Sequence, residues 1–513
     1  MPAIDNKRIA RNAILMYIRM VVSMFVGLFT SRIVLQQLGE VDFGVYNVIA
    51  GIIVIFSYIS SSFASSSSRF ISYALGEGDE KNVSEVFATL LFVNIGFCII
   101  SLFLGETVGL WYVLHILKYP EALHDVVMVI YQVCIISMCF NILAIPFTSM
   151  IIARERMEIY AYITLFDVFA KLGIAISLIY LDNKLEIYAV MQGIVSLSLL
   201  ILYYIISKKR KFINSLSLRY NKKILKEILK FCSWIFVGGI SNIMSTQGIN
   251  LLLNYVFGVI INTAYGLTMQ IQNAVRSLSL SFQMALNPQL IKSYASGNIV
   301  GHRLLIFRSM RFSFYLILIL SLPIYFNVAG LLEIWLGKYP EATIAFVKWI
   351  LLANIVSTLA NPLGVSVEAS GKIKKISLYT SIALASVLPI SWIVLKVCET
   401  SVVPFVVFLC GQILCLIIKL HYAMKVSSIS FSEIFNGSFK YVLFVGGISY
   451  LLCCGLSFLI PNTYSGTLLN VILCLLISIM VSFILGFQRK EKIEIVRIIK
   501  NKTLHRFCNE NSN

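Results

Sequence analysis

Six ionisable residues lie inside long apolar segments of this chain, and their types indicate the chemistry of anion binding. They are Arg19, Arg32, Asp167, Lys171, Arg276 and Lys348. A charge at the bilayer centre costs about 2.5–3.5 kcal/mol on insertion scales, so it normally faces a polar cavity or a partner. All but Asp167 are cations. Arginine binds phosphate oxygens in a forked geometry, and a low dielectric strengthens the attraction. The set therefore favours an anionic substrate over a cationic one.

Arg276 is the strongest candidate for binding a phosphate group. It lies well inside its apolar segment, and no acidic residue occurs within four positions of it. Its charge must therefore be neutralised from another helix or by a ligand. Arg19 and Arg32 are further candidates, although each lies close enough to the end of its segment for a long side chain to reach the headgroup region.

Asp167 and Lys171 are four residues apart, so on a helix they lie on one face and can neutralise each other. One interpretation is a purely structural ion pair. The other is coupling of transport to a proton or an ion, for which Asp167 is the one acid we nominate.

Polar uncharged residues near these charges predict a hydrated cavity wall that offers amides and hydroxyls to sugars or phosphates. The alternative is that the small hydroxyl residues of the Ser-rich stretch 57–70 pack helices together. The candidates for the cavity wall are Gln270, Gln272, Asn273 and Ser66.

The composition requires membrane-spanning helices to carry these residues. The chain has 513 residues, of which 58% are hydrophobic and 13% charged, and its mean hydropathy is +0.87. Soluble domains carry about 25% charged residues. We therefore predict an all-α polytopic membrane protein, whose first apolar segment is a membrane helix and not a removable signal peptide. The fourteen predicted spans are 13–35, 43–66, 86–110, 125–152, 158–181, 185–206, 231–256, 260–287, 308–332, 342–367, 376–397, 401–424, 439–460 and 466–487.

The net charge of +18 is explained by topology, not by nucleic acid binding. With the N-terminus in the cytoplasm, the inside segments and adjoining helix ends hold 33 of the 42 Lys and Arg. This bias predicts that both termini are cytoplasmic. The eleven Cys are scattered without a CxxC pair or a Cys/His cluster, so we expect no metal and no cofactor.

The pentapeptide KYPEA occurs at 118–122 and again at 338–342, after the third and ninth spans. Neighbouring motifs repeat at a similar offset, including Leu38-Gly39 with Phe257-Gly258. The chain is therefore predicted to hold two parallel six-helix repeats, a known transporter plan in which the substrate path lies between the lobes. None of the six charges has a counterpart in the other repeat, so helix packing alone does not require them.

The repeat divides the chain into an N-lobe at 1–206 and a C-lobe at 231–425, followed by a helix pair at 426–487 and a basic cytoplasmic tail at 488–513. The basic linker 207–230 contains an amphipathic segment. It is predicted either to lie on the inner membrane surface or to extend the seventh span as a helix.

Three segments resemble a known transporter family: RIVLQQLGEVDFGVYNVIAGI at 32–52, SSRFISYALGEGD at 67–79 and PLGVSVEASGKIKK at 362–375. They are similar to the polysaccharide-transport branch of the multidrug/oligosaccharidyl-lipid/polysaccharide exporter superfamily, which includes the Wzx-type O-antigen and capsule repeat-unit flippases. The resemblance implies two six-helix lobes around a cationic cavity in the bacterial inner membrane. It implies a substrate built on undecaprenyl pyrophosphate, with Arg32, Arg69 and Arg276 nearest to the cavity arginines of related lipid II flippases.

The sequence therefore predicts a flippase for a lipid-linked oligosaccharide. Expected partners are this substrate, the bilayer, and a polysaccharide polymerase or glycosyltransferases. One alternative is a cation-coupled multidrug antiporter of the same superfamily, which would place several acids in the cavity. The other is a membrane enzyme of polysaccharide assembly. An enzyme is not expected, because the predicted outside loops are short and the five His residues form no cluster.

Overall fold

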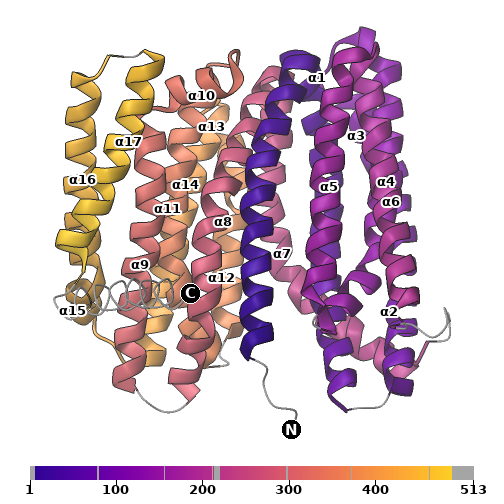
Figure 1. Ribbon diagram of the computed structural model, residues 1–513, viewed down its shortest axis with the longest axis horizontal. Helices are drawn as coiled ribbons and strands as arrows, with labels where there is room; N and C mark the ends of the chain where they lie inside the picture. The colour runs from indigo at the N-terminus through magenta and orange to yellow at the C-terminus, as the bar shows by residue number, and fades with distance from the viewer. Residues whose placement is uncertain are drawn as a thin grey trace, which may run out of the picture. The chain divides into compact units, whose positions relative to one another are not determined.

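The computed structural model is built of long helices (Figure 1), and the residues that it describes contain no β-strand. These residues are 6–77, 80–154, 156–210, 212, 220–295, 299–370, 373–461, 463–487 and 491. Their side chains are described except at 6–17, 52–66, 69, 72, 73, 76, 77, 230–240, 242, 278, 280, 281, 284–286, 288, 289, 291, 292, 295 and 373. The predicted all-α fold class is confirmed.

The helices differ greatly in length, and the longest, at residues 6–77, joins the predicted spans 13–35 and 43–66. The α-helices are α1 (Asn6–Glu77), α2 (Glu80–Leu104), α3 (Leu110–His115), α4 (His124–Ala153), α5 (Met157–Ser177), α6 (Lys184–Lys209), α7 (Lys222–Phe257), α8 (Val259–Ala295), α9 (Ile299–Phe326), α10 (Val328–Leu336), α11 (Ala342–Ala369), α12 (Ile373–Ala385), α13 (Val387–Leu395), α14 (Val403–Ser427), α15 (Phe431–Ile434), α16 (Lys440–Leu459) and α17 (Tyr464–Val481). Short π or 3-10 turns are η1 (Gly105–Gly109), η2 (Glu121–Leu123), η3 (Leu178–Tyr180), η4 (Phe435–Phe439) and η5 (Ser482–Gly486).

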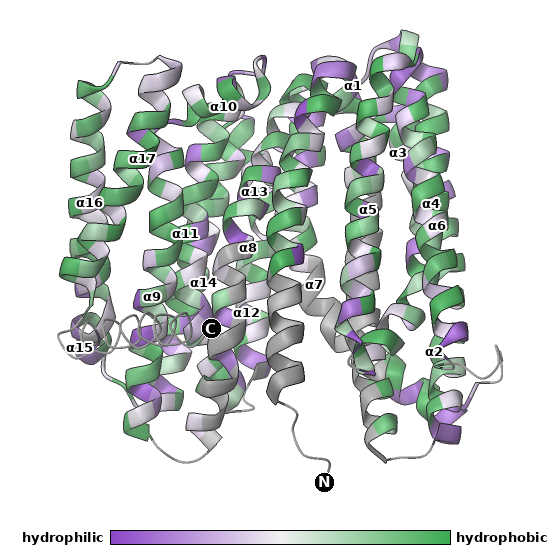
Figure 2. Ribbon diagram, in the orientation of Figure 1, coloured by the Kyte–Doolittle hydropathy of each residue, from purple (hydrophilic) through white to green (hydrophobic). Residues whose placement is uncertain are grey.

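Eleven helical segments of the described residues are long and apolar enough to span a membrane. They coincide with eleven of the predicted spans. The remaining three, 43–66, 231–256 and 260–287, fall in helices whose side chains are only partly described. Hydrophobic residues predominate along the described helices (Figure 2), and many large apolar side chains are exposed, including Phe103 and Phe458. Apolar exposure on this scale is what contact with lipid requires, so the chain is a multi-pass membrane protein.

The packing of the chain divides it into two compact units. Unit 1 comprises Met1–Ile271, Trp335–Phe346 and Ser377–Gly411, and unit 2 comprises Gln272–Ile334, Val347–Ile376 and Gln412–Asn513. The helices α8, α10, α11, α12 and α14 contribute residues to both units. The predicted lobe boundaries follow the sequence repeat instead of this division, and they stay a prediction.

Unit 1 is organised around α1, which packs against α4, α5 and α7, while α4 also packs against α2 and α6. These helices run side by side in Figure 1. One core cluster joins Ile71 of α1 to Val86 and Phe87 of α2 and to Met150 of α4, all of them buried. This packing holds the long, partly exposed helices in a fixed bundle.

The second half of the predicted linker forms the start of α7, which runs from Lys222 to Phe257. The Asn221 side chain accepts a hydrogen bond from the backbone N–H of Lys223 at 3.0 Å and caps the helix. Ile228 is fully buried, and Ile224 and Leu225 pack against the core cluster that contains it. Residues 222–230 therefore follow the second interpretation of the linker, an extension of the seventh span. Residues 211 and 213–219 lie outside the described part of the chain.

Two glycines at equivalent positions of the sequence repeat share an unusual backbone conformation. Gly39 has φ 80° and ψ 177°, and Gly258 has φ 83° and ψ −172°. This region is essentially restricted to glycine. Gly39 marks a kink inside α1, and Gly258 separates α7 from α8. The predicted internal repeat is therefore visible in the backbone of unit 1.

Each repeat also places the first helix of one half against the KYPEA region of the other. Asn254 of α7 donates its side-chain N–H to the backbone carbonyl of Lys118 at 3.3 Å. Gln36 of α1 donates to the carbonyl of Leu336 at 3.4 Å. Asn254 follows Gln36, and Leu336 follows Lys118, by the same 218 residues. The two contacts are thus reciprocal.

A second pair of crossed contacts lies beside the first, at an offset that differs from the 219 and 220 residues relating the two glycines and the two KYPEA copies. The Tyr112 hydroxyl donates to the carbonyl of Leu251 at 3.5 Å, and the Trp335 indole N–H donates to the carbonyl of Leu28 at 2.8 Å. Trp335 follows Tyr112, and Leu251 follows Leu28, by the same 223 residues. The four crossed contacts give the repeated sequence a structural role, because each copy attaches to the other half of the chain.

Unit 2 contains the helix pair that follows the repeat. α9 packs against α16 and α17, which also pack against each other. Near the end of α17, the buried Arg311 of α9 donates to the Glu491 carboxylate at 2.7 Å, and Arg308 donates to the same oxygen at 3.0 Å. These ion pairs attach Glu491, which lies beyond the last membrane-spanning segment, to α9.

Candidate functional site

Three charged residues from three helices of unit 2 come together. Arg276 lies on α8, Glu368 on α11 and Lys419 on α14, and Lys419 is close enough to both others to interact with them electrostatically. Arg276 and Glu368 are exposed, and Lys419 is half-buried. Within the described part of the chain, none of the three forms an ion pair within 4 Å or a hydrogen bond through its side chain. We call these residues the unit 2 charge cluster.

Lys419 lies beside a glycine of the neighbouring helix. A methyl group at Gly364 of α11 would lie 3.5 Å from Lys419 Cε and 3.7 Å from its Nζ. The stem of Lys419 therefore lies across α11 at the level of Gly364. Glu368 follows Gly364 by four residues and so lies on the same helix face. The lysine stem therefore runs along the face of α11 that also carries Glu368.

A polar face of α8 and a polar face of α11 meet beside this cluster. The Gln272 side chain donates to Asn354 at 3.1 Å, and Asn361 donates to Gln283 at 2.7 Å. Gln283 in turn donates to the carbonyl of Thr358 at 3.3 Å. Arg276 occupies the same stripe as Gln272 and Gln283, because the positions are separated by intervals of three or four on the helix. The amide pairs therefore fix the helix that presents Arg276.

The unit 2 charge cluster can bind an anion. Its two cations exceed its one carboxylate, and neither cation is neutralised by a close ion pair within the described residues. A phosphate group placed between Arg276 and Lys419 would receive charge-assisted hydrogen bonds, which are about twice as strong as neutral ones. Glu368 can serve as the counter-ion when no ligand is bound.

A second cluster of charges lies in unit 1, on α1, α5 and α6. Arg19 donates to the Thr164 hydroxyl at 3.4 Å and lies over the Tyr160 ring at 5.3 Å from its centre. Asp167 and Lys171 form an ion pair at 2.9 Å, as their spacing allows. The buried Tyr203 of α6 interacts electrostatically with both Arg19 and Asp167. Arg19 and the candidate coupling acid therefore belong to one site.

Two polar atoms of this unit 1 charge cluster are buried and have no hydrogen-bond partner among the described residues. They are Arg19 Nε and Asp167 Oδ1. A buried polar atom that stays unsatisfied costs about 1–3 kcal/mol. Water, a proton on the carboxylate or a bound ion would relieve this cost, so the cluster has capacity for a ligand or for a change of protonation.

The other residues predicted to bind the substrate or to line the cavity belong to α1 and α8. Arg32 lies half-buried on α1. Gln270, in unit 1, has a buried side-chain oxygen without a partner, whereas Gln272, in unit 2, is buried and paired with Asn354. Asn273 is exposed on α8. The side chains of Arg69 and Ser66 lie outside the described part of the structure.

Sequence reasoning missed Lys419 and Glu368. Glu368 directly follows the predicted span 342–367, and Lys419 lies near the end of the span 401–424. Charged residues at span ends were attributed to membrane topology. One indication was present in the sequence: Lys419 falls inside the predicted span 401–424 and carries no acidic residue within four positions, the same pattern that singled out Arg276.

A pocket of about 400 Å³ in unit 2 lies between α10 and the start of α17. Its only charged lining residue is Glu333, which accepts a hydrogen bond from Tyr464 at 3.3 Å. It therefore does not suit an anion. Among the residues whose side chains are described, no group of three or more His, Cys, Asp and Glu could hold a metal ion.

Comparison with known proteins identifies one partial family match and several structures of the same fold. Residues 16–179 match the MatE family model. A search of curated proteins finds no match. An inward-facing multidrug resistance MATE family transporter of the MOP superfamily has a TM-score of 0.65 at 15% identity, covering 81% of this chain and 98% of its own.

Two further solved structures show the same fold. The lipid II flippase MurJ, in an inward closed conformation, has a TM-score of 0.63 at 13% identity and covers 92% of this chain and 98% of its own. The Vibrio cholerae MATE transporter VcmN, in its bent form, has a TM-score of 0.56 at 15% identity and covers 84% of this chain and 100% of its own. At these identities the likeness concerns the fold. The chain has the polytopic fold shared by MATE transporters and the flippase MurJ, and its first helices match the MatE family model.

Proposed function

We propose that this protein is a flippase that moves a polyprenyl-diphosphate-linked oligosaccharide across the bacterial inner membrane. The observation that carries the proposal is the unit 2 charge cluster, in which Lys419 lies within electrostatic range of both Arg276 and Glu368 and neither cation has a close ion pair in the described structure. A net positive site on membrane-spanning helices suits a diphosphate.

The chemistry of such a substrate explains why a protein is needed. Each polar group that enters hydrocarbon without a hydrogen-bond partner costs several kcal/mol, so sugars and a diphosphate do not cross unaided. In the proposed mechanism, the diphosphate binds between Lys419 and Arg276 and replaces Glu368 as the main counter-ion of Lys419. Return of the carboxylate to the lysine then assists release. The lipid tail stays in the bilayer throughout.

Asp167 is the proposed coupling residue, through protonation or ion binding at the unit 1 charge cluster. Its unpartnered Oδ1 and its contact with Lys171 support this role. Protonation would release Lys171 and leave the Arg19 region more positive, so the charge of one residue controls the charge of the cluster. Arg32 and Arg69 stay proposed contacts of the diphosphate.

The fold supports transport, and MurJ, which shares this fold, is a flippase for the lipid-linked substrate lipid II. We extend this substrate class to the present chain because of its cationic cluster. Cytoplasmic termini are proposed from the distribution of Lys and Arg. A polymerase or glycosyltransferases acting on the same lipid remain proposed partners, and no catalytic role is proposed for the chain itself.

A cation-coupled multidrug antiporter is the second candidate. Several of the similar structures are multidrug resistance transporters, and the structure adds the acid Glu368 to Asp167. Against it, each of the two acids lies beside a lysine, so neither cluster is negative overall. A cationic drug would be repelled from both.

The test is transport by purified protein in liposomes that contain a fluorescent polyprenyl diphosphate oligosaccharide. Movement to the inner leaflet protects the fluorophore from a membrane-impermeant reductant. We expect Arg276→Gln and Lys419→Gln to weaken the apparent affinity about 10- to 100-fold, since a hydrogen bond to a charged group contributes roughly 1.5–3 kcal/mol.

Lys425→Gln is the matched control, because Lys425 is an exposed lysine on the same helix, α14. It should leave transport unchanged. Normal transport by both cluster variants, or uptake of a cationic dye in place of the lipid, would refute the flippase proposal.

A further inference from the structure

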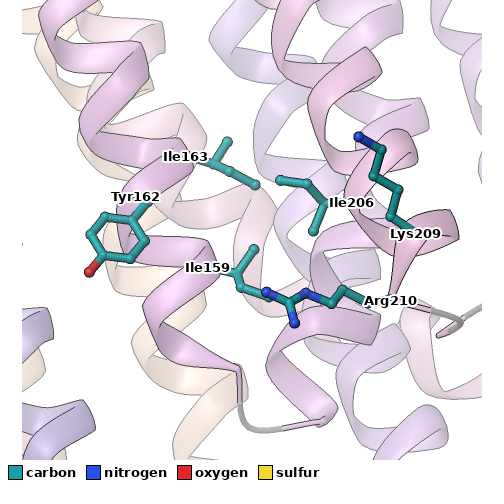
Figure 3. Close-up of a pocket in the computed structure, with 6 residues that line it drawn as sticks. All are labelled: Ile159, Tyr162, Ile163, Ile206, Lys209 and Arg210. Atoms are coloured by element: carbon teal, nitrogen blue, oxygen red, sulfur yellow. The ribbon is translucent and has the colours of Figure 1, made fainter.

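A pocket of about 290 Å³ in unit 1 lies between α5 and the end of α6, and its lining includes no residue of the unit 1 charge cluster (Figure 3). Its wall is apolar and its edge is basic. The apolar wall consists of Ile159, Tyr162 and Ile163 of α5 with Ile206 of α6, and the edge consists of Lys209 and Arg210. The pocket lies where both spans end, so it opens at one surface of the membrane.

The two cations face the pocket without an acidic partner. Figure 3 shows the Lys209 side chain directed back along α6 and the Arg210 guanidinium lying beside Ile159. Within the described residues, neither side chain forms a hydrogen bond or an ion pair. The nearest acid in the sequence of α5 is Glu158, and it is paired with Arg156 at 3.4 Å. The pocket therefore combines two positive charges with an apolar wall.

The pocket lies on the lipid-exposed side of α5. Tyr162 begins a stripe that continues through Phe166 and Phe169, with exposed fractions of 65%, 47% and 52%. The residues of the unit 1 charge cluster on α5 occupy positions 160, 164, 167 and 171, which form a different stripe of the helix. A ligand would therefore enter the pocket from the bilayer and not from the transport cluster.

α6 provides a second apolar path to the same place. Ile194, Leu197, Ile201 and Ile205 are exposed along this helix, and Lys209 follows Ile205 by four residues. The lysine thus ends an apolar stripe. A phosphate bound at Lys209 and Arg210 could send its acyl chains along the exposed faces of α5 and α6.

We propose that this pocket binds the headgroup of an anionic membrane phospholipid, such as phosphatidylglycerol. Basic pockets between membrane helices bind phosphate headgroups, and each basic residue near the surface strengthens binding about 5-fold. The apolar wall then receives the first carbons of the tails. The bound phospholipid would hold α5 and α6 together at this end of the two helices.

The experiment is native mass spectrometry of the purified full-length protein with added phosphatidylglycerol, using phosphatidylethanolamine as the zwitterionic reference. The variant Lys209→Gln/Arg210→Gln should lose retention of phosphatidylglycerol about 30-fold, the factor that corresponds to roughly 2 kcal/mol for two basic residues. Lys208→Gln is the control: it removes a charge from the same helix end, but Lys208 lies over the Tyr204 ring at 5.8 Å and not in the pocket.

A second variant tests the pocket itself. Ile206→Trp fills the apolar wall without changing a charge, and it should also reduce retention. Inorganic phosphate should not compete, because it has no tails to bury. A thermal unfolding midpoint equal to that of the parent protein shows that each variant is folded.

Three results would overturn the proposal. Equal losses in Lys208→Gln and in the double variant would show general attraction to charge. Full retention by Ile206→Trp would show that the pocket is not used. Displacement of bound phosphatidylglycerol by an added polyprenyl diphosphate, in proportion to its concentration, would assign the site to the transported lipid instead.

Discussion

At the scale of single residues, the anion site depends on the balance between cations and carboxylates. The sequence identified Arg276, because an isolated arginine inside a span needs a partner from elsewhere. It did not identify Glu368 and Lys419 as the other charged residues of this cluster, because the sequence does not show which helix faces meet. Asp167 and Lys171 were predictable as a pair, since both lie on one helix. The sequence did not predict that Tyr203 interacts electrostatically with both Arg19 and Asp167.

Replacing Glu368 with Gln should strengthen binding of an anionic substrate. The change removes the carboxylate that interacts with Lys419 and leaves the two cations of the cluster in place. We expect the concentration of lipid-linked oligosaccharide at half-maximal transport to fall several-fold, while the maximal rate also falls because release is no longer assisted. Kinetics in liposomes separate the two effects. A weaker affinity for the lipid in this variant would contradict the assigned role of Glu368.

At the scale of helices, amide side chains join α8 to α11. The sequence predicted a hydrated wall at Gln272, whereas in the structure this residue is buried and paired with Asn354. Polar residues within spans can line water or bind other helices, and composition alone does not separate these outcomes. The start of α7 is a second case that composition does not decide, because an amphipathic segment can pack against protein as well as against a membrane surface.

Gln283→Leu should destabilise the protein by about 0.6–1.7 kcal/mol, the range of interhelical hydrogen bonds in membrane proteins. The variant leaves the Asn361 amide, which now donates to Gln283, without its acceptor. Unfolding by denaturing detergent measures the loss. The double variant Gln283→Leu/Asn361→Leu should recover most of it, because the second change removes the unsatisfied amide. No recovery would indicate that packing volume and not hydrogen bonding matters at this contact.

The ion pair between Arg311 of α9 and Glu491, which lies beyond the end of α17, should contribute more to stability. Glu491 and Arg311 are both buried, with exposed side-chain fractions of 3% and 2%. Removing one partner of a buried ion pair typically costs about 3–5 kcal/mol. Glu491→Gln should therefore lower the thermal unfolding midpoint clearly. Glu433→Gln is the comparison, since its pair with Arg303 is 47% exposed on the glutamate side and should matter little. Equal midpoints for the two variants would contradict this account.

At the scale of the whole molecule, the sequence predicted most of the fold. Hydropathy located the spans because a bilayer demands long apolar helices, and the repeated KYPEA indicated the duplication. What it could not supply was the exchange of contacts between the halves. Leu28, Leu251 and Asn254 lie inside predicted spans, and Gln36 directly follows one. Only the folded backbone brings these residues to the tips of the opposite repeat.

Movement between the halves must break these crossed contacts if it opens the KYPEA end. In a variant without native cysteines, Lys118→Cys with Asn254→Cys should form a disulfide that stops transport, and a reductant should restore it. Lys184→Cys with Gln37→Cys is the control, because Lys184 donates to Gln37 at 3.0 Å within one half of the chain. That disulfide should leave transport intact. Full transport by the oxidised Lys118/Asn254 variant would exclude opening at this end.

The crossed contacts between the two halves are also relevant to how a duplicated chain of this kind could arise. In a two-fold symmetric dimer, residue i of one subunit contacts residue j of the other, and j contacts i in return. In each pair of crossed hydrogen bonds, each repeat supplies one donor and one acceptor. A progenitor of half this length would therefore have satisfied its tips by association with an identical molecule. Gene fusion would then have preserved an existing dimer interface within one polypeptide.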